Sequence, residues 1–243
     1  MKNLFFLLLI LPLTSCGTSE LNWIILSPNN VEGSTNLKFL LGGLTTTIYI
    51  SIVSIVISMI IGFIVAVPSL AKSKFLTYLN IGYVEIVRAV PLLVLILWIY
   101  YGLPIMTGIS FSPFVSGIIA LSISESAFQA EIFRAGINSI KKAQWEAGSS
   151  LGLNFLRKLR LVILPQAIKN ILPAIGNQFV YVLKMSSLVS IIGIGDLTRK
   201  ANELVVTTYR PLEIYTFLIF EYLILILIVS FLVRKLEKNL EKD

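Results

Sequence analysis

The chain has 243 residues, of which 56% are hydrophobic and only 14% charged, and its mean hydropathy is +0.87. This composition excludes an ordinary soluble protein, and apolar runs close to the length that crosses a bilayer recur along the chain. The net charge of +7 comes from basic residues in short loops between these runs. That distribution is typical of membrane proteins with the positive-inside pattern and does not indicate a nucleic-acid-binding surface.

Several kinds of active site are excluded by residues that the sequence lacks. There is no His, which excludes a Ser-His protease and the usual haem ligand. A single Cys excludes an intramolecular disulfide and a thiolate-rich metal site. No P-loop motif occurs, so the chain should not bind ATP through one. We therefore expect a protein that is not an enzyme, with no catalytic residues, no metal and no cofactor.

Residues 1–16 form a signal-like segment, with Lys2 before an apolar run from Leu4 to Leu13 that is too short to span a bilayer. Leu13-Thr14-Ser15-Cys16 resembles a lipoprotein box, in which Cys16 would be lipidated and residues 1–15 removed. The alternative is an uncleaved hydrophobic start in which Cys16 is an ordinary small residue. Residues 17–36 are polar and are predicted to be an external linker.

Five apolar segments are expected to cross the membrane, at about residues 44–67, 83–101, 114–133, 171–192 and 212–233. The first has small residues at three- and four-residue spacing, which predicts a helix face for close packing: Thr47, Ser51, Ser54, Ser58 and Gly62. Glu85 and Arg88 in the second segment could pair across one helical turn. In the external stretch 193–211, a solvated helix face is expected from Asp196, Arg199, Lys200 and Glu203.

The third segment contains two acidic residues, Glu125 and Glu131. An acid inside a membrane is costly and is a candidate functional group by default. Glu131 lies three residues before Arg134, so we predict a structural ion pair between them. Glu125 is deeper, and it could either face a translocation path or pair with Lys184 of the fourth segment.

The basic residues of the loops predict how the spans are oriented in the membrane. With five spans, most of these residues fall on one side, and only a few fall on the other: Lys38, Arg199, Lys200 and Arg210. The bias predicts a multi-pass protein with its N-terminus outside and its C-terminus in the cytoplasm.

The polar loop 137–168 lies between the third and fourth segments. Gln144 to Leu151 suits a short helix, which Gly152 can end in the left-handed conformation. Asn154 is then a suitable N-cap for a second short helix from Phe155 to Leu164. Small residues in the first helix would let the surface of another protein approach the backbone closely.

This loop resembles the EAA loop of ABC-importer permeases, the cytoplasmic segment that docks on the ATPase subunit. The matching residues include Gly148 where the family has Ala and Val162 where it has Ile. The resemblance implies an ATPase-coupling role for Glu146, Ala147, Gly148, Gly152, Leu164 and Pro165. An ordinary amphipathic loop between two spans is the alternative interpretation.

Further stretches resemble the polar-amino-acid permeases among these importers: RAVPLLV at 88–94, AEIFRAGI at 130–137, LPAIGNQF at 172–179 and KMSSLVS at 184–190. Ala89 and Val90 replace the family's Gly-Thr, and Met185 replaces an acid beside Lys184, so that a local counter-ion is lost. The resemblance implies an all-α integral membrane protein with about five transmembrane helices and the type I ABC-importer permease (MetI-like) fold. Residues 37–240 would form this permease domain.

The same resemblance implies transport of polar amino acids across the bacterial cytoplasmic membrane by alternating access, with glutamine or a cationic amino acid such as arginine as candidates. It implies as partners a cytoplasmic ABC ATPase dimer, a second permease subunit of the same or a similar chain, an external solute-binding protein and membrane lipid, with no nucleic acid. Polar residues of the third and fourth segments are candidates for the substrate path: Glu125, Gln129, Asn177, Lys184, Ser186 and Ser187.

Three other functions are weighed against this one. A permease for another small polar solute would use the same architecture. A non-transporting membrane anchor would use the loop only as a docking surface. An intramembrane enzyme is disfavoured because the chain has no His and no paired aspartates.

Overall fold

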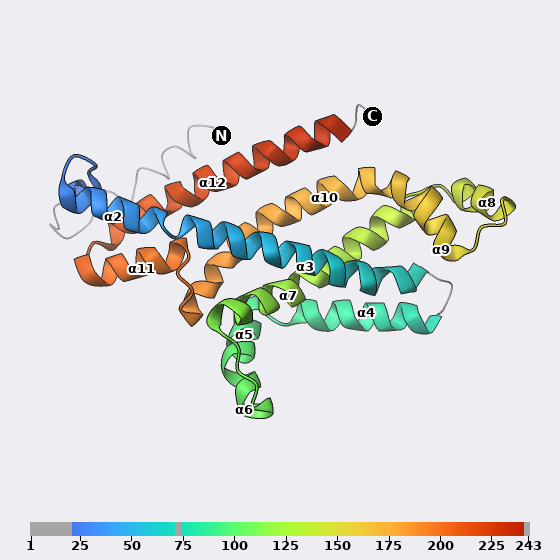
Figure 1. The fold of residues 1–243 in the computed structure, drawn as a ribbon, viewed down its shortest axis with the longest axis horizontal. Helices are drawn as coiled ribbons and strands as arrows, with labels where there is room; N and C mark the ends of the chain where they lie inside the picture. The colour runs from blue at the N-terminus through green and yellow to red at the C-terminus, as the bar shows by residue number, and fades with distance from the viewer. Residues whose placement is uncertain (1–20, 71–73, 241–243) are drawn as a thin grey trace, which may run out of the picture.

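A computed structural model describes residues 21–70 and 74–240, and every regular element in these ranges is helical (Figure 1). The signal-like segment and Cys16 lie outside the described residues. The elements are η2 (Trp23–Leu26), α2 (Val31–Leu41), α3 (Leu44–Leu70), α4 (Lys74–Ala89), α5 (Leu92–Leu97), η3 (Trp98–Gly102), α6 (Leu103–Thr107), α7 (Pro113–Asn138), α8 (Lys142–Ser150), α9 (Phe155–Lys158), η4 (Leu159–Ile163), α10 (Leu164–Met185), η5 (Ser186–Ile192), α11 (Leu197–Thr208) and α12 (Pro211–Leu240).

The long helices run between two ends of an elongated molecule (Figure 1). The helices α2 and α11 lie at one end, and α8 and α9 lie at the other. Helix α7 contacts α3, α4, α5 and α10, and its contact with α3 is the most extensive helix pair in the described structure. The core of the bundle is therefore built around α7.

The predicted small-residue face of α3 is confirmed. Its hydroxyl residues Thr47, Ser51, Ser54 and Ser58 are fully buried. At Gly62 any side chain would be too close to α7, because a Cβ there would lie 2.8 Å from the backbone nitrogen of Ala130. Small side chains thus let the two backbones approach, as they do between membrane helices in general.

The second predicted span, residues 83–101, is wrong as a single straight helix. Helix α4 ends at Ala89, Pro91 is the N-cap of α5, and the two helical arms meet at a bend of 90°. Proline disfavours the helical conformation of the residue before it, and it has no N–H to donate to the carbonyl four residues earlier. The helix therefore breaks at Val90 and Pro91. In Figure 1 the arm of α5 and α6 projects away from the other helices.

Three helical stretches of the described chain are long and apolar enough to cross a membrane, namely Val31–Pro68, Phe155–Ile192 and Pro211–Lys238. The bent pair Lys74–Ala89 and Leu92–Thr107 makes a fourth if it is counted as one span. The 26-residue helix α7 is long enough but is not in this group. Its buried residues include several polar ones, such as Ser122, Glu125 and Gln129. The described residues therefore contain three or four stretches that are both long and apolar enough, and the expected span at α7 is not among them.

Part of the expected external linker is helical. The Asn30 side chain caps α2, and the backbone N–H of Asn22 donates to Glu213 Oε1 at 2.9 Å. Apolar residues of η2 and α2, including Leu26 and Leu40, form a buried cluster with Ala201 and other residues of α11 and α12. This end of the molecule therefore carries a packed helical cap.

The expected solvated face of α11 is wrong for one residue. Asp196 is fully buried, and its Oδ1 accepts the N–H of Arg199 at 2.9 Å as the N-cap of α11. Arg199 instead pairs with Glu203 at 2.7 Å on a partly exposed face, and Lys200 lies 4.2 Å from the ring centroid of Phe39.

Candidate functional site

The polar loop has the two-helix geometry that the sequence predicts. Helix α8 ends at Ser150, Gly152 follows with a φ of +72°, and the Asn154 side chain accepts the N–H of Arg157 at 2.9 Å. The space around Gly152 is open, so that its left-handed backbone, and not crowding, favours glycine there. The break at Gly152 and the cap at Asn154 are both confirmed.

The end of the second loop helix differs from the prediction. Instead of stopping at Leu164, α9 continues through the π-helical turn η4 directly into α10. Pro165 lies in the first turn of α10, where its missing N–H is tolerated. In a π turn each hydrogen bond spans five residues instead of four. The chain therefore passes from α9 through η4 into α10 as one continuous helix. The loop is thereby joined rigidly to α10.

Helix α8 presents an exposed surface at this end of the molecule. Glu146 and Ala147 are exposed, and Leu151 at the C-cap is 75% exposed although it is apolar. On the inner side, the rings of Trp145 and Phe155 stack at 6.0 Å between centroids and hold α8 against α9.

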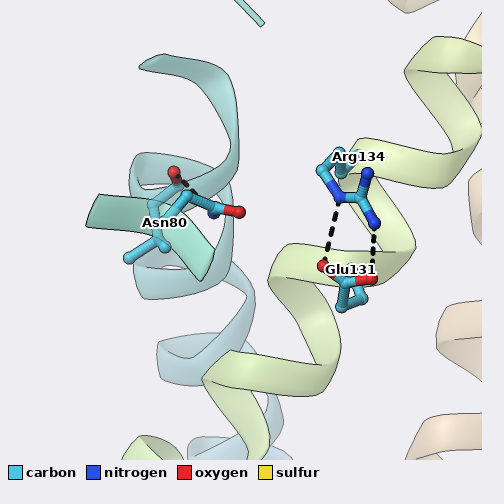
Figure 2. Close-up of polar contacts among 4 residues, drawn as sticks. Asn80, Glu131 and Arg134 are labelled. Carbon is cyan, nitrogen blue, oxygen red and sulfur yellow. Dashed lines mark hydrogen bonds and ion pairs between the residues drawn. The ribbon is translucent and has the colours of Figure 1, made fainter. Parts of the chain in front are cut away.

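Polar contacts fix the helices that lead to this loop (Figure 2). Arg134 and Glu131 of α7 form the predicted ion pair through two hydrogen bonds, with Nη2 2.8 Å from Oε2 and Nε 3.1 Å from Oε1. Asn80 of α4 donates from Nδ2 to the carbonyl oxygen of Val65 in α3 at 3.1 Å. The ion pair lies within α7, whereas the Asn80 contact joins α4 to α3.

The two substrate-path candidates on α7 are buried inside the bundle. Glu125 is 1% exposed and accepts a hydrogen bond from Gln178 Nε2 of α10 at 2.5 Å, so the suggested partner Lys184 is wrong. Gln129 is fully buried on α7, next to Gly62 of α3, and its amide atoms have no hydrogen-bond partner among the described residues. Sequence reasoning missed Gln178 because the pairing joins residues 53 positions apart.

The remaining path candidates lie on α10 and at the start of η5. Asn177 and Lys184 are exposed, whereas Ser186 is buried and donates to the carbonyl of Leu183 at 2.8 Å. Ser187 donates to the carbonyl of Lys184 at 2.8 Å. The structure brings Asn177 and Lys184 onto one side of the helix, seven residues apart, which matches two helical turns.

An aromatic contact that the sequence did not indicate extends this side of α10. Tyr181, 41% exposed, lies between Asn177 and Lys184 and contacts Phe128 of α7 at 6.3 Å between ring centroids. Arg88 of α4 places its guanidinium 4.7 Å from the centroid of Phe128. No ion pair joins Arg88 to Glu85 in the described structure. The spacing of four residues from Asn177 to Tyr181 places both on one side of α10, but it does not indicate the contact with Phe128.

Comparison with known proteins agrees with this architecture. Residues 58–242 match the family described as binding-protein-dependent transport system inner membrane component. The chain is 37% identical to the probable glutamine ABC transporter permease protein GlnM of Bacillus subtilis (86% of this chain, 96% of that protein) and 34% identical to the arginine transport system permease protein ArtQ of the same organism (85% and 94%).

A solved structure described as an amino acid ABC transporter with histidines matches with a TM-score of 0.78 and 38% identity, over 85% of this chain and 96% of that one. The family match covers most of the chain, and the relatives align over nearly their whole length. The chain therefore belongs to the binding-protein-dependent transport system inner membrane components, the permease subunits of ABC transporters.

Proposed function

We propose that this chain is the membrane permease subunit of an ABC importer for polar amino acids, with glutamine and arginine as the first solutes to test. The observation that carries this proposal is the near full-length similarity to permeases named for glutamine and for arginine, together with the matched amino acid transporter structure. The ATP hydrolysis would come from a partner ATPase, and solute would be delivered by an external binding protein. The cytoplasmic membrane is the expected location.

The connections of α8 support a coupling role, and we refer to α8 as the coupling helix. It follows α7 after only three residues, 139–141, and it leads into α10 through α9 and η4. A displacement of the coupling helix by an ATPase would therefore reach two spans at once. Glu146, Ala147 and Leu151 are the exposed residues with which the ATPase would dock.

The exposed side of α10 supports a place for substrate. Asn177, Tyr181 and Lys184 follow each other along it, and Arg88 lies next to the same aromatic contact. Polar and cationic groups of this kind can bind the carboxylate and amide that polar amino acids carry. In one chain this side is open, and a second permease subunit facing it would enclose a path. Glu125 is buried inside the bundle, where it accepts a hydrogen bond from Gln178 of α10. From there its carboxylate would favour solutes with a positively charged side chain.

The same arrangement supports an orientation in the membrane. The coupling helix and α9 lie at one end of the molecule, and α2 and α11 lie at the other (Figure 1). The segment 141–160 at the first end carries five basic residues, namely Lys141, Lys142, Arg157, Lys158 and Arg160. We infer that the first end is cytoplasmic, because basic loops remain inside, and that the N-terminus is outside.

The docking role is tested with the Gly152→Asp variant and a matched control. Gly108, between α6 and α7, has the same φ of +72° and equally open space but lies far from α8 along the chain. Each variant is expressed in full length with candidate amino-acid ABC ATPases and purified in mild detergent. Wild type and Gly108→Asp should capture an ATPase, and Gly152→Asp should express but lose that capture.

Equal capture by both variants would contradict the docking assignment. Uptake of labelled glutamine, arginine and unrelated polar solutes by the complex in vesicles then tests the solute class. Stimulation of ATPase activity by solute and binding protein separates a transporter from a membrane anchor, which would bind the ATPase without such stimulation.

A further inference from the structure

A large cavity lies behind the coupling helix. It has a volume of about 970 Å³, and it is lined by the end of α3, the first turn of α4, the end of α7, α8 and α9. Its lining includes Leu70, Arg134, Lys142, Trp145, Phe155 and Lys158. The ends of three long helices meet there, which places the cavity at the level where a bilayer surface would lie.

The charges around this cavity are predominantly positive. Lys142 and Lys158 line it against a single acid, Glu146, and the third basic residue of the lining, Arg134, is already paired with Glu131 of α7. Glu146 lies 3.3 Å from Lys142, but both side chains are well exposed, at 64% and 90%, so this ion pair holds Lys142 only weakly. Lys158 Nζ donates to the hydroxyl of Ser149 at 2.8 Å, and no acid pairs with it among the described residues. Two ammonium groups are thus available to an anion.

The apolar part of the lining is equally distinct. Leu70 ends α3, and the stacked rings of Trp145 and Phe155 form one wall. Tryptophan is enriched where membrane meets water, because its ring is apolar and its N–H is polar. Basic pockets between spans on the cytoplasmic side are suited to anionic lipid head groups. A site with lysines beside aromatic rings fits a molecule that carries both phosphate and hydrocarbon.

We propose that this cavity binds the phosphate head group of an anionic phospholipid such as phosphatidylglycerol, with Lys142 and Lys158 as its ligands and Trp145 beside the glycerol region. A lipid bound there joins the coupling helix to the ends of α3, α4 and α7. This inference rests on the proposed placement of α8 at the cytoplasmic membrane surface, but it concerns lipid binding and not ATPase capture, so the two can fail separately.

The test uses the full-length chain with Trp23→Phe and Trp98→Phe, which leaves Trp145 as the single tryptophan because the sequence has three. The protein is placed in phosphatidylcholine vesicles that contain either brominated phosphatidylglycerol or brominated phosphatidylcholine. Stronger quenching of Trp145 by the anionic lipid is expected. The double variant Lys142→Gln, Lys158→Gln should lose this difference. The control Lys169→Gln, Lys235→Gln, which changes exposed lysines that do not line the cavity, should keep it.

Three results would overturn the proposal. One is equal quenching by the two lipids, and another is a lipid preference that survives the double variant. The third is loss of the preference when inorganic phosphate replaces chloride at constant ionic strength, which would assign the site to free phosphate. A further check adds a captured ATPase. If the stronger quenching by phosphatidylglycerol then disappears, the cavity belongs to the ATPase contact; if it persists, lipid binding is supported. Retention of phosphatidylglycerol by wild type and control in native mass spectrometry gives an independent readout.

Discussion

The side chain of Lys158 in α9 packs against the backbone of Gly148 in the coupling helix. A Cβ on Gly148 would be 2.8 Å from Lys158 Cγ and 3.1 Å from its Cδ, and the Lys158 ammonium reaches the hydroxyl of Ser149 at 2.8 Å. The related loop motif has alanine where this chain has Gly148. The space that the glycine leaves is filled by the lysine stem, which explains the departure in physical terms.

This contact predicts that the effect of Gly148→Ala depends on Lys158. In a helix interior alanine is favoured over glycine by about 0.5–1 kcal/mol, but here the added methyl must displace the lysine stem. Gly148→Ala should therefore leave the melting temperature nearly unchanged in wild type and raise it in the Lys158→Ala background. Melting in detergent across this double-mutant cycle measures the coupling. An equal increase in both backgrounds would show that the two residues do not interact.

Gly62→Ala should destabilise the bundle. The new methyl would lie 2.8 Å from the Ala130 nitrogen, and backbone cannot yield as a flexible side chain can. Overpacking of this kind costs about 1–3 kcal/mol, so a clearly lower melting temperature is expected. Gly82→Ala is the matched control, since a Cβ on this α4 residue meets nothing within 4 Å. If Gly62→Ala melts no lower than Gly82→Ala, α3 and α7 do not approach each other as closely as the structure indicates.

Local patterns predicted much of the fold. The small face of α3, the left-handed Gly152 and the cap at Asn154 each depend on residues close in sequence, and each is confirmed. The 90° bend at Pro91 was missed because the apolar run continues through the proline. Hydropathy measures how apolar a segment is and does not report whether its helix is straight. The continuation of α9 into α10 was missed because a proline in the first turn of a helix and a proline that ends one look alike in sequence.

The substrate candidates show where sequence is insufficient. The six candidates were chosen as polar residues of two spans, but polarity does not indicate which way each side chain faces. Glu125 and Gln129 face the bundle interior, and Asn177 and Lys184 face outward. The pairing of Glu125 with Gln178 and the contact of Arg88 with Phe128 depend on how α4, α7 and α10 pack, which no local pattern encodes.

Glu125→Gln should reduce arginine uptake more than glutamine uptake. The amide oxygen of the new glutamine can still accept from Gln178, so assembly should be retained while the charge is removed. Competition uptake in vesicles, with labelled arginine and labelled glutamine in turn, measures the ratio. Gln178→Leu is the comparison, because it leaves the buried carboxyl without its donor and should lower stability by about 1–3 kcal/mol. An equal loss for both solutes would remove Glu125 from substrate selection.

Asp196→Asn should stabilise, at neutral pH, the end of the molecule where α11 packs against α2. Burial raises the pKa of the Asp196 carboxyl to about 6, above its ordinary 3.8, although the N–H of Arg199 opposes the shift. The folded protein then holds a proton that the unfolded chain releases, so stability is greatest at low pH and is lost as the pH rises from about 4 to about 6. Asparagine keeps the capping oxygen for Arg199 without the buried charge.

Melting curves of wild type and Asp196→Asn between pH 4.5 and pH 7.5 check this prediction. The variant should be more stable by about 1–3 kcal/mol at pH 7, and the difference should diminish toward the acid end because protonated aspartate resembles asparagine there. Glu203→Gln is the control, since this partly exposed acid of the same helix pairs with Arg199 at the surface and should not reproduce the pH trend. A difference that is constant with pH would mean that Asp196 stays ionised in the folded protein. Its effect would then arise from the cap alone, and the buried carboxylate would have to be compensated by a group that the present geometry does not place beside Oδ2.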